Sequence, residues 1–124
     1  MSKFKKDFVN EDIVYFKVDG RKFGYIPVTA GDESDWLMEY TFITDKGEVK
    51  QNLSVLNKLK ICSKLEVVPY DKEDIKAIIN IDKSWKELSL DERWALLRKL
   101  RPKLFDEIVK KINDINNGSK KKTL

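Results

Sequence analysis

Two apolar helical segments joined at a proline constrain the fold of this chain more than any other feature. They lie in the stretch SWKELSLDERWALLRKLRPKLFDEIVKKIND, residues 84–114. Ser89 and Glu92 have the spacing of a capping box, in which the serine oxygen accepts from the Glu92 amide and the glutamate reaches back. Pro102 would clash inside a continuous helix but suits the first turn of a new one. We predict helices over about 90–100 and 102–116.

The apolar residues of these helices exceed what a single buried stripe requires. One stripe runs at steps of three, four and seven and predicts a face that packs on a core. Its members are Leu90, Trp94, Leu97, Leu104, Ile108 and Ile112. Further apolar residues flank or widen it, and surplus aromatic and leucine surface is typical of protein interfaces. We predict a partner-binding surface made of Trp85, Leu88, Leu96, Leu100, Phe105 and Val109, with Arg93, Arg98 and Arg101 as a charged rim.

The first half of the chain has the pattern of a small antiparallel sheet. Residues 12–28 read as a β-hairpin, because apolar residues alternate on both sides of the turn dipeptide Asp19-Gly20. WLMEYTFIT, at 36–44, alternates in the same way and predicts a third strand after an acidic loop. A short fourth strand is expected around 48–53.

The remaining segments connect this sheet to the two helices. LSVLNKLKICSKL, at 53–65, has helical spacing of its apolar residues, and LEVVPY after it indicates a short strand. Asp71 is positioned to cap another helix. The expected fold class is α+β, one domain over 1–118 with the sheet over about 12–53 and the helical part over about 54–117. Residues 119–124 are expected to form a disordered basic tail.

The residue types argue against an enzyme. The chain has no histidine, and a single cysteine, Cys62, cannot build a zinc site. The densest carboxylate group is Asp32, Glu33 and Asp35, which lacks the ligand periodicity of a calcium loop. We therefore expect no catalytic residues, no metal and no cofactor.

The net charge of +4 comes from the two ends of the chain. Six lysines lie in the first six and last six residues, and the sequence between them has 19 basic and 21 acidic side chains. Nucleic-acid-binding domains concentrate positive charge on a folded face, so nucleic acid is not the expected partner. An alternative remains open in which the basic ends act with the sheet aromatics Tyr15, Phe23 and Tyr25 on single strands.

The sequence also predicts where the protein resides. No apolar run is long enough to cross a membrane, and the charged N-terminus lacks the apolar segment of a secretory signal. One unpaired cysteine fits a reducing compartment. We expect a cytoplasmic protein, in the host cell if the protein is viral.

The second half of the chain resembles the tail-assembly chaperones and related small tail-region proteins of tailed bacteriophages and prophages. The resemblance rests on LEVVPY followed by a W-x-x-L-[ST]-x-x-E-R-x-x-L-L-x-x-L pattern, which falls on Trp85, Leu88, Ser89, Glu92, Arg93, Leu96, Leu97 and Leu100. It implies a non-enzymatic factor that binds the tape-measure or tail-tube protein through an apolar helical surface. A structural subunit of a virion or tail has the same sequence features, and self-association into a homo-oligomer is a further expectation.

Overall fold

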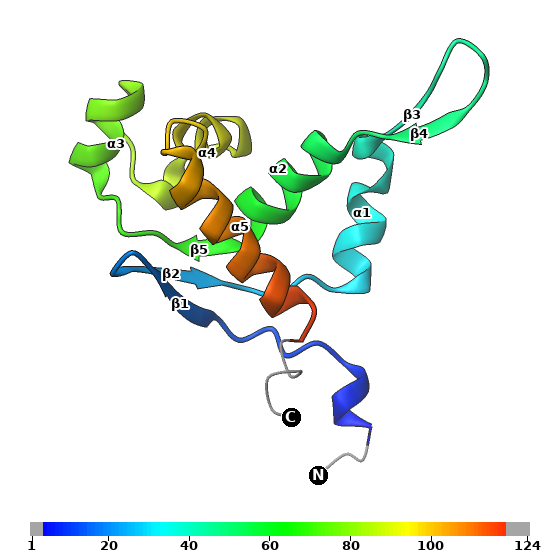
Figure 1. The fold of residues 1–124 in the computed structure, drawn as a ribbon, viewed down its shortest axis with the longest axis horizontal. Helices are drawn as coiled ribbons and strands as arrows, with labels where there is room; N and C mark the ends of the chain where they lie inside the picture. The colour runs from blue at the N-terminus through cyan, green and yellow to red at the C-terminus, as the bar shows by residue number, and fades with distance from the viewer. Residues whose placement is uncertain (1–3, 119–124) are drawn as a thin grey trace.

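The computed structural model describes residues 4–118 and has an α+β fold, with an antiparallel sheet and helices packed around it (Figure 1). The strands are β1 (Val14–Val18), β2 (Arg21–Tyr25), β3 (Thr41–Ile43), β4 (Val49–Gln51) and β5 (Leu65–Val67). The α-helices are α1 (Ala30–Tyr40), α2 (Leu53–Lys64), α3 (Lys72–Ile79), α4 (Leu90–Leu97) and α5 (Pro102–Asn116). Two short 3-10 helices are η1 (Lys5–Asp7) and η2 (Trp85–Glu87).

The predicted hairpin is confirmed as β1 and β2. Asp19 and Gly20 form its turn with φ of 53° and 76°, as a two-residue turn matched to the strand twist requires. β5 then pairs antiparallel with the other edge of β2, giving the order β1-β2-β5. The main sheet is therefore completed by a strand from the second half of the chain.

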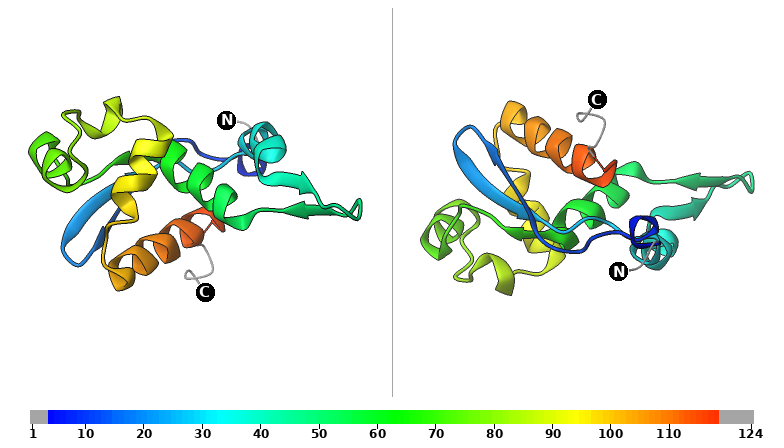
Figure 2. Two further views of the ribbon diagram at one scale, coloured as in Figure 1. Left: turned by 90° about the horizontal axis from the view of Figure 1, so that it is seen from above. Right: turned by 90° about the horizontal axis from the view of Figure 1, so that it is seen from below.

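Helix α5 covers one face of this sheet and α2 and α4 complete the core (Figures 1 and 2). Phe23 and Tyr25 are fully buried on the sheet side, and Ile108 and Ile112 of α5 belong to the same buried core cluster. The capping box at Ser89 is confirmed, and Pro102 is the first residue of α5. The predicted helix over about 90–100 is shorter than expected, because α4 ends at Leu97.

A polar tie joins the C-terminal turn of α5 to the segment that leaves β2. The Asn116 side-chain amide donates to the Tyr25 hydroxyl at 3.1 Å, and its oxygen accepts from the Val28 amide at 2.9 Å. The Tyr25 hydroxyl in turn donates to the Lys60 carbonyl at 2.9 Å. Because each of these buried or half-buried groups has a partner, the tie fixes α5 and α2 against the sheet.

The expected strand at 36–44 is wrong over most of its length. Residues 30–40 form α1, and the acidic segment predicted as a loop is its first turn, with a capping box between Thr29 and Asp32. Trp36 and Tyr40, one helical turn apart, are its buried residues. Met38, which shares their face in a strand, is 86% exposed. The sheet expected over about 12–53 is therefore two sheets separated by a helix.

Strands β3 and β4 form a separate hairpin that projects from the body of the molecule (Figure 2). They pair with each other, with Ile43 opposite Val49 and Phe42 opposite Lys50. The tip is ordered by the Gly47 amide, which donates to the Thr44 carbonyl at 2.9 Å. A hairpin held in this way presents its side chains in a fixed arrangement.

Gly24 is expected to tolerate no larger residue. A Cβ at this position would lie 2.9 Å from Ile13 Cγ2 and 3.0 Å from Val67 Cβ, and the second atom is fixed to the β5 backbone. We expect Gly24→Ala to lower the free energy of unfolding by about 1–3 kcal/mol through overpacking. Gly31→Ala is the matched control, since only ordinary contact is available there. Urea denaturation of both variants measures the difference, and equal losses would contradict the crowding at Gly24.

Candidate protein-binding site

The structure divides the predicted partner-binding residues into two groups. Trp85, Leu88 and Leu96 are buried in the core, so the prediction that they form an accessible surface is wrong. Leu96 is buried because α4 packs against both α2 and α3. Trp85 and Leu88 lie in the segment before α4, where the Trp85 indole N–H donates to the Leu65 carbonyl at 2.8 Å. Leu100, Phe105 and Val109 are half-buried at the edge of the same core, and Arg98 and Arg101 are exposed.

Arg93 has a structural position and lies away from any rim. Its Nε donates to the Trp85 carbonyl at 3.1 Å and a terminal nitrogen donates to the Cys62 carbonyl at 2.8 Å. The guanidinium also lies 4.9 Å from the centre of the Trp85 ring. One side chain thereby links α2, η2 and α4, which corrects its assignment as a charged rim residue.

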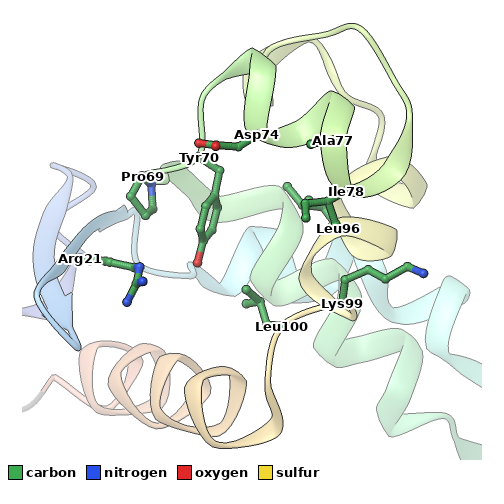
Figure 3. A pocket seen from close by; sticks show the side chains of 9 residues that line it. All are labelled: Arg21, Pro69, Tyr70, Asp74, Ala77, Ile78, Leu96, Lys99 and Leu100. Atoms are coloured by element: carbon green, nitrogen blue, oxygen red, sulfur yellow. The ribbon is translucent and has the colours of Figure 1, made fainter.

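Of the accessible predicted residues, Leu100 lines a groove at the corner where α4 turns into α5 (Figure 3). Phe105 and Arg98 instead line a second hollow together with Leu100, Trp94 and Pro102. The corner groove has a volume of about 380 Å³ and is lined from the start of β2, the segment after β5, α3 and the end of α4 with the residues that follow it. Its apolar lining consists of Pro69, Tyr70, Ala77, Ile78, Leu96 and Leu100. The apolar lining thus comes from three segments between residues 69 and 100, and Arg21 is added from β2.

The rim of the corner groove carries charges of both signs. Arg21, Lys99 and Asp74 lie on its walls, and an adjoining cavity that shares the first two extends to the side chains Arg101, Lys103, Asp19 and Glu107. Arg21 is paired with Asp19 at 3.1 Å. Lys99 and Lys103 are exposed and have no ion pair within 4.0 Å in residues 4–118. These two lysines can therefore meet acidic groups of an occupant.

Tyr70 contributes a polar atom that lacks a partner. Its hydroxyl is buried and has no hydrogen bond in residues 4–118, although its ring lines the corner groove. In Figure 3 the hydroxyl end lies toward Arg21 and Leu100. Burial raises the pKa of this phenol, so it stays protonated and is available as a donor. An unpaired buried polar group costs about 1–3 kcal/mol, which a bound acceptor would offset.

A second exposed apolar surface lies on residues that the sequence patterns did not assign to a binding site. We define the arm as residues 30–53, which comprise α1, the β3–β4 hairpin and the start of α2. Its exposed apolar side chains are Leu37, Met38, Phe42, Ile43, Val49 and Leu53. The sequence signal for the arm is the T-x-x-D capping box that begins at Thr29 and predicts a helix after it. A helix at this position separates the strands that follow it from the main sheet.

Asp32, one of the three carboxylates at the start of the arm, has a structural role. Asp32 completes the α1 capping box and lies 2.8 Å from the Lys64 ammonium. Its burial raises the pKa, but hydrogen bonds from Lys64 and Thr29 outweigh this effect and lower the pKa overall. Among residues 4–118, no group of three or more cysteine, aspartate or glutamate side chains is placed to hold a metal ion.

The aromatic platform of the nucleic-acid alternative is not formed. Phe23 and Tyr25 have no exposed surface, and Tyr15 is the exposed member of the three. The Lys22 ammonium lies 4.3 Å above the Tyr15 ring. The C-terminal lysines and the predicted disordered tail lie outside the described residues.

Cys62 is expected to be unreactive in the folded protein. Its side chain is fully buried, and this burial raises the pKa of the thiol to about 12. Since the thiolate is the reactive form, labelling by a disulfide reagent at pH 8 should be at least tenfold slower in buffer than in denaturant. The time course of absorbance measures both rates, and rapid labelling of the native protein would contradict the burial.

Comparison with known protein families, with curated proteins and with solved structures found no match to this chain. Within residues 4–118, none of the helices combines the length and the apolar character needed to cross a membrane.

Proposed function

We propose that this protein is a non-enzymatic binding and assembly factor that holds an amphipathic helix of another protein in the corner groove. The observation that carries the proposal is an apolar floor, with Ile78 and Leu100, beside the exposed ammonium groups of Lys99 and Lys103. Apolar side chains at successive turns of a partner helix would fill such a groove, and acidic residues on its flank would meet the rim.

The resemblance of the second half of the chain to phage tail proteins supplies the proposed partner class. A tape-measure protein has long helical segments that need cover before assembly, and a tail-tube subunit is the other partner that the resemblance implies. We propose the role of a transient tail-assembly chaperone. A structural tail subunit is the alternative, and finding the protein in purified particles would favour it.

The test is site-specific photo-crosslinking in the native host. A photoreactive residue in place of Ile78, on the groove wall, should capture a discrete partner, which mass spectrometry identifies. The same residue in place of Lys110, exposed on α5, should capture none. Failure to crosslink at position 78, or equal products at both positions, would count against the corner groove.

Two matched substitutions on α3 make this test specific. Ala77→Glu places a charge inside the apolar groove, whereas Lys76→Glu changes a neighbouring exposed residue outside it. A glutamate at this exposed position must be desolvated when an apolar segment fills the groove, so Ala77→Glu should weaken capture about tenfold or more. Lys76→Glu should leave capture within about twofold, because surface charges contribute little.

A further inference from the structure

The arm is an apolar surface that the rest of the molecule leaves uncovered. Met38, Ile43 and Val49 are 86%, 71% and 70% exposed. Ile43 and Val49 are opposite each other across β3 and β4, so they form one apolar pair close to the hairpin tip. The strands of this hairpin lie outside the main sheet. Exposed apolar residues on a projecting hairpin are typical of an interaction surface.

The charge of the arm restricts what can cover it. Residues 30–53 have six acidic and two basic side chains, and Asp45 and Glu48 lie at the hairpin tip on either side of Gly47. Two arms packed against each other would bring like charges together, which is unfavourable. A complementary surface must therefore be apolar and offer basic side chains that are not already paired.

The corner groove has both properties and lies at the other end of the same molecule. Figures 1 and 2 show the β3–β4 hairpin at one end and, at the opposite end, the β1–β2 turn and α3, which lines the groove. The arm of a molecule cannot reach its own groove. A contact between the two surfaces therefore joins different copies.

We propose that the arm of one copy docks into the corner groove of a second copy. Ile43 and Val49 contact the floor around Ile78 and Leu100, and Asp45 and Glu48 pair with Lys99 and Lys103 on the rim. The inference rests on the proposed function in one respect, the capacity of the groove to hold an apolar segment with acidic flanks. A partner helix and the arm then compete for one groove.

This contact is heterologous, because it uses a different surface on each copy. Repeated contacts of this kind close into a ring or continue as a filament. Occupation by the arm keeps the groove covered in the absence of a partner, and a partner helix with higher affinity releases it. Self-association is thus the regulatory state of the proposed binding site.

Charge reversal combined with sedimentation velocity tests the contact. The arm variant carries Asp45→Lys and Glu48→Lys, and the rim variant carries Lys99→Glu and Lys103→Glu. All four side chains are exposed and lack ion pairs within 4.0 Å in residues 4–118. The parent should associate with increasing protein concentration. Each variant alone should associate at least about tenfold more weakly than the parent. Lys110→Glu on α5 is the control and should behave as the parent.

The chain with all four reversals decides between arm–groove and arm–arm contact. A basic arm on an acidic rim restores complementarity, so this chain should regain association to within about threefold of the parent. If it stays as weak as the arm variant, the proposal is overturned. The double substitution Ile43→Ser with Val49→Ser should abolish association in the parent and in the chain with all four charge reversals. Retained association in either chain would also overturn the proposed arm–groove contact.

The outcomes separate this inference from the proposed function. A parent that stays monomeric at every concentration, while position 78 still crosslinks another protein, overturns the arm contact and leaves partner binding standing. Concentration-dependent association with the expected charge rescue, while position 78 crosslinks only a second copy, supports the arm contact and rejects the partner helix.

Discussion

Replacing Trp85 with alanine should lower the free energy of unfolding by about 3–5 kcal/mol, the range typical of buried aromatic residues. The side chain is 5% exposed, and its indole N–H donates to the Leu65 carbonyl at 2.8 Å. Truncation would leave both a cavity and an unpaired carbonyl at the start of β5. Urea unfolding followed by circular dichroism measures the loss.

Two other substitutions show which part of the Trp85 interaction matters. Trp85→Phe retains much of the packing but loses the hydrogen bond, so it should cost less than the alanine variant. Trp94→Ala is the matched control, because Trp94 is half-buried and meets Phe105 edge to face at 5.9 Å. It should cost about 2 kcal/mol. A larger loss at Trp94 than at Trp85 would contradict the assignment of the core.

Replacing Arg93 with methionine should lower the free energy of unfolding by about 2–4 kcal/mol. Methionine keeps the apolar stem but cannot donate to the Trp85 and Cys62 carbonyls, and hydrogen bonds from a charged group are worth about 1.5–3 kcal/mol each. The Cys62 carbonyl is near the C-terminal end of α2, where a positive charge is favourable. Chemical denaturation is the measurement.

Arg93→Lys distinguishes geometry from charge at this position. An ammonium group lacks the planar fork that reaches two carbonyls, so lysine should recover only part of the loss. Arg98→Met, at an exposed position in the same segment, should change the free energy of unfolding by less than about 0.5 kcal/mol. If the methionine variants at Arg93 and Arg98 lower the free energy of unfolding equally, Arg93 has no structural role and both arginines act as surface residues.

The elements predicted correctly are those whose signals are local. The Asp19-Gly20 turn, the Ser89 capping box and the Pro102 helix start each act within a few residues, and all three are present in the structure. Helices α2 and α3 and strand β5 were also predicted, since their apolar spacing and caps are local. The fold class follows from these elements in order.

The segment at 36–44 was misread because two periods fit the same letters. Trp36 and Tyr40 are four residues apart. This spacing is two periods of strand alternation and about one turn of a helix, so both patterns place the two side chains on one face. Met38 alone decides between the two, and methionine is common both in cores and at surfaces. The capping box at Thr29 is the local signal that resolves the ambiguity.

The predicted binding surface was only partly right, because helix periodicity does not say how many neighbours a helix has. Leu96 is beside the main stripe on α4, but α3 packs on that side and buries it. Leu100 lines the corner groove, as a predicted contact residue would. The groove itself combines residues as distant as Arg21 and Lys99, a proximity that no local pattern encodes.

The tie between Asn116 and Tyr25 places the end of α5 next to a strand made some ninety residues earlier in the chain. During translation, Phe23 and Tyr25 leave the ribosome long before Ile108 and Ile112, which belong to the same buried core cluster. The growing polypeptide therefore exposes the two aromatic side chains of β2 until the final helix has been synthesised. Contacts this distant also slow the search for the native state. Truncation before α5 should yield an aggregating product rather than a smaller folded one.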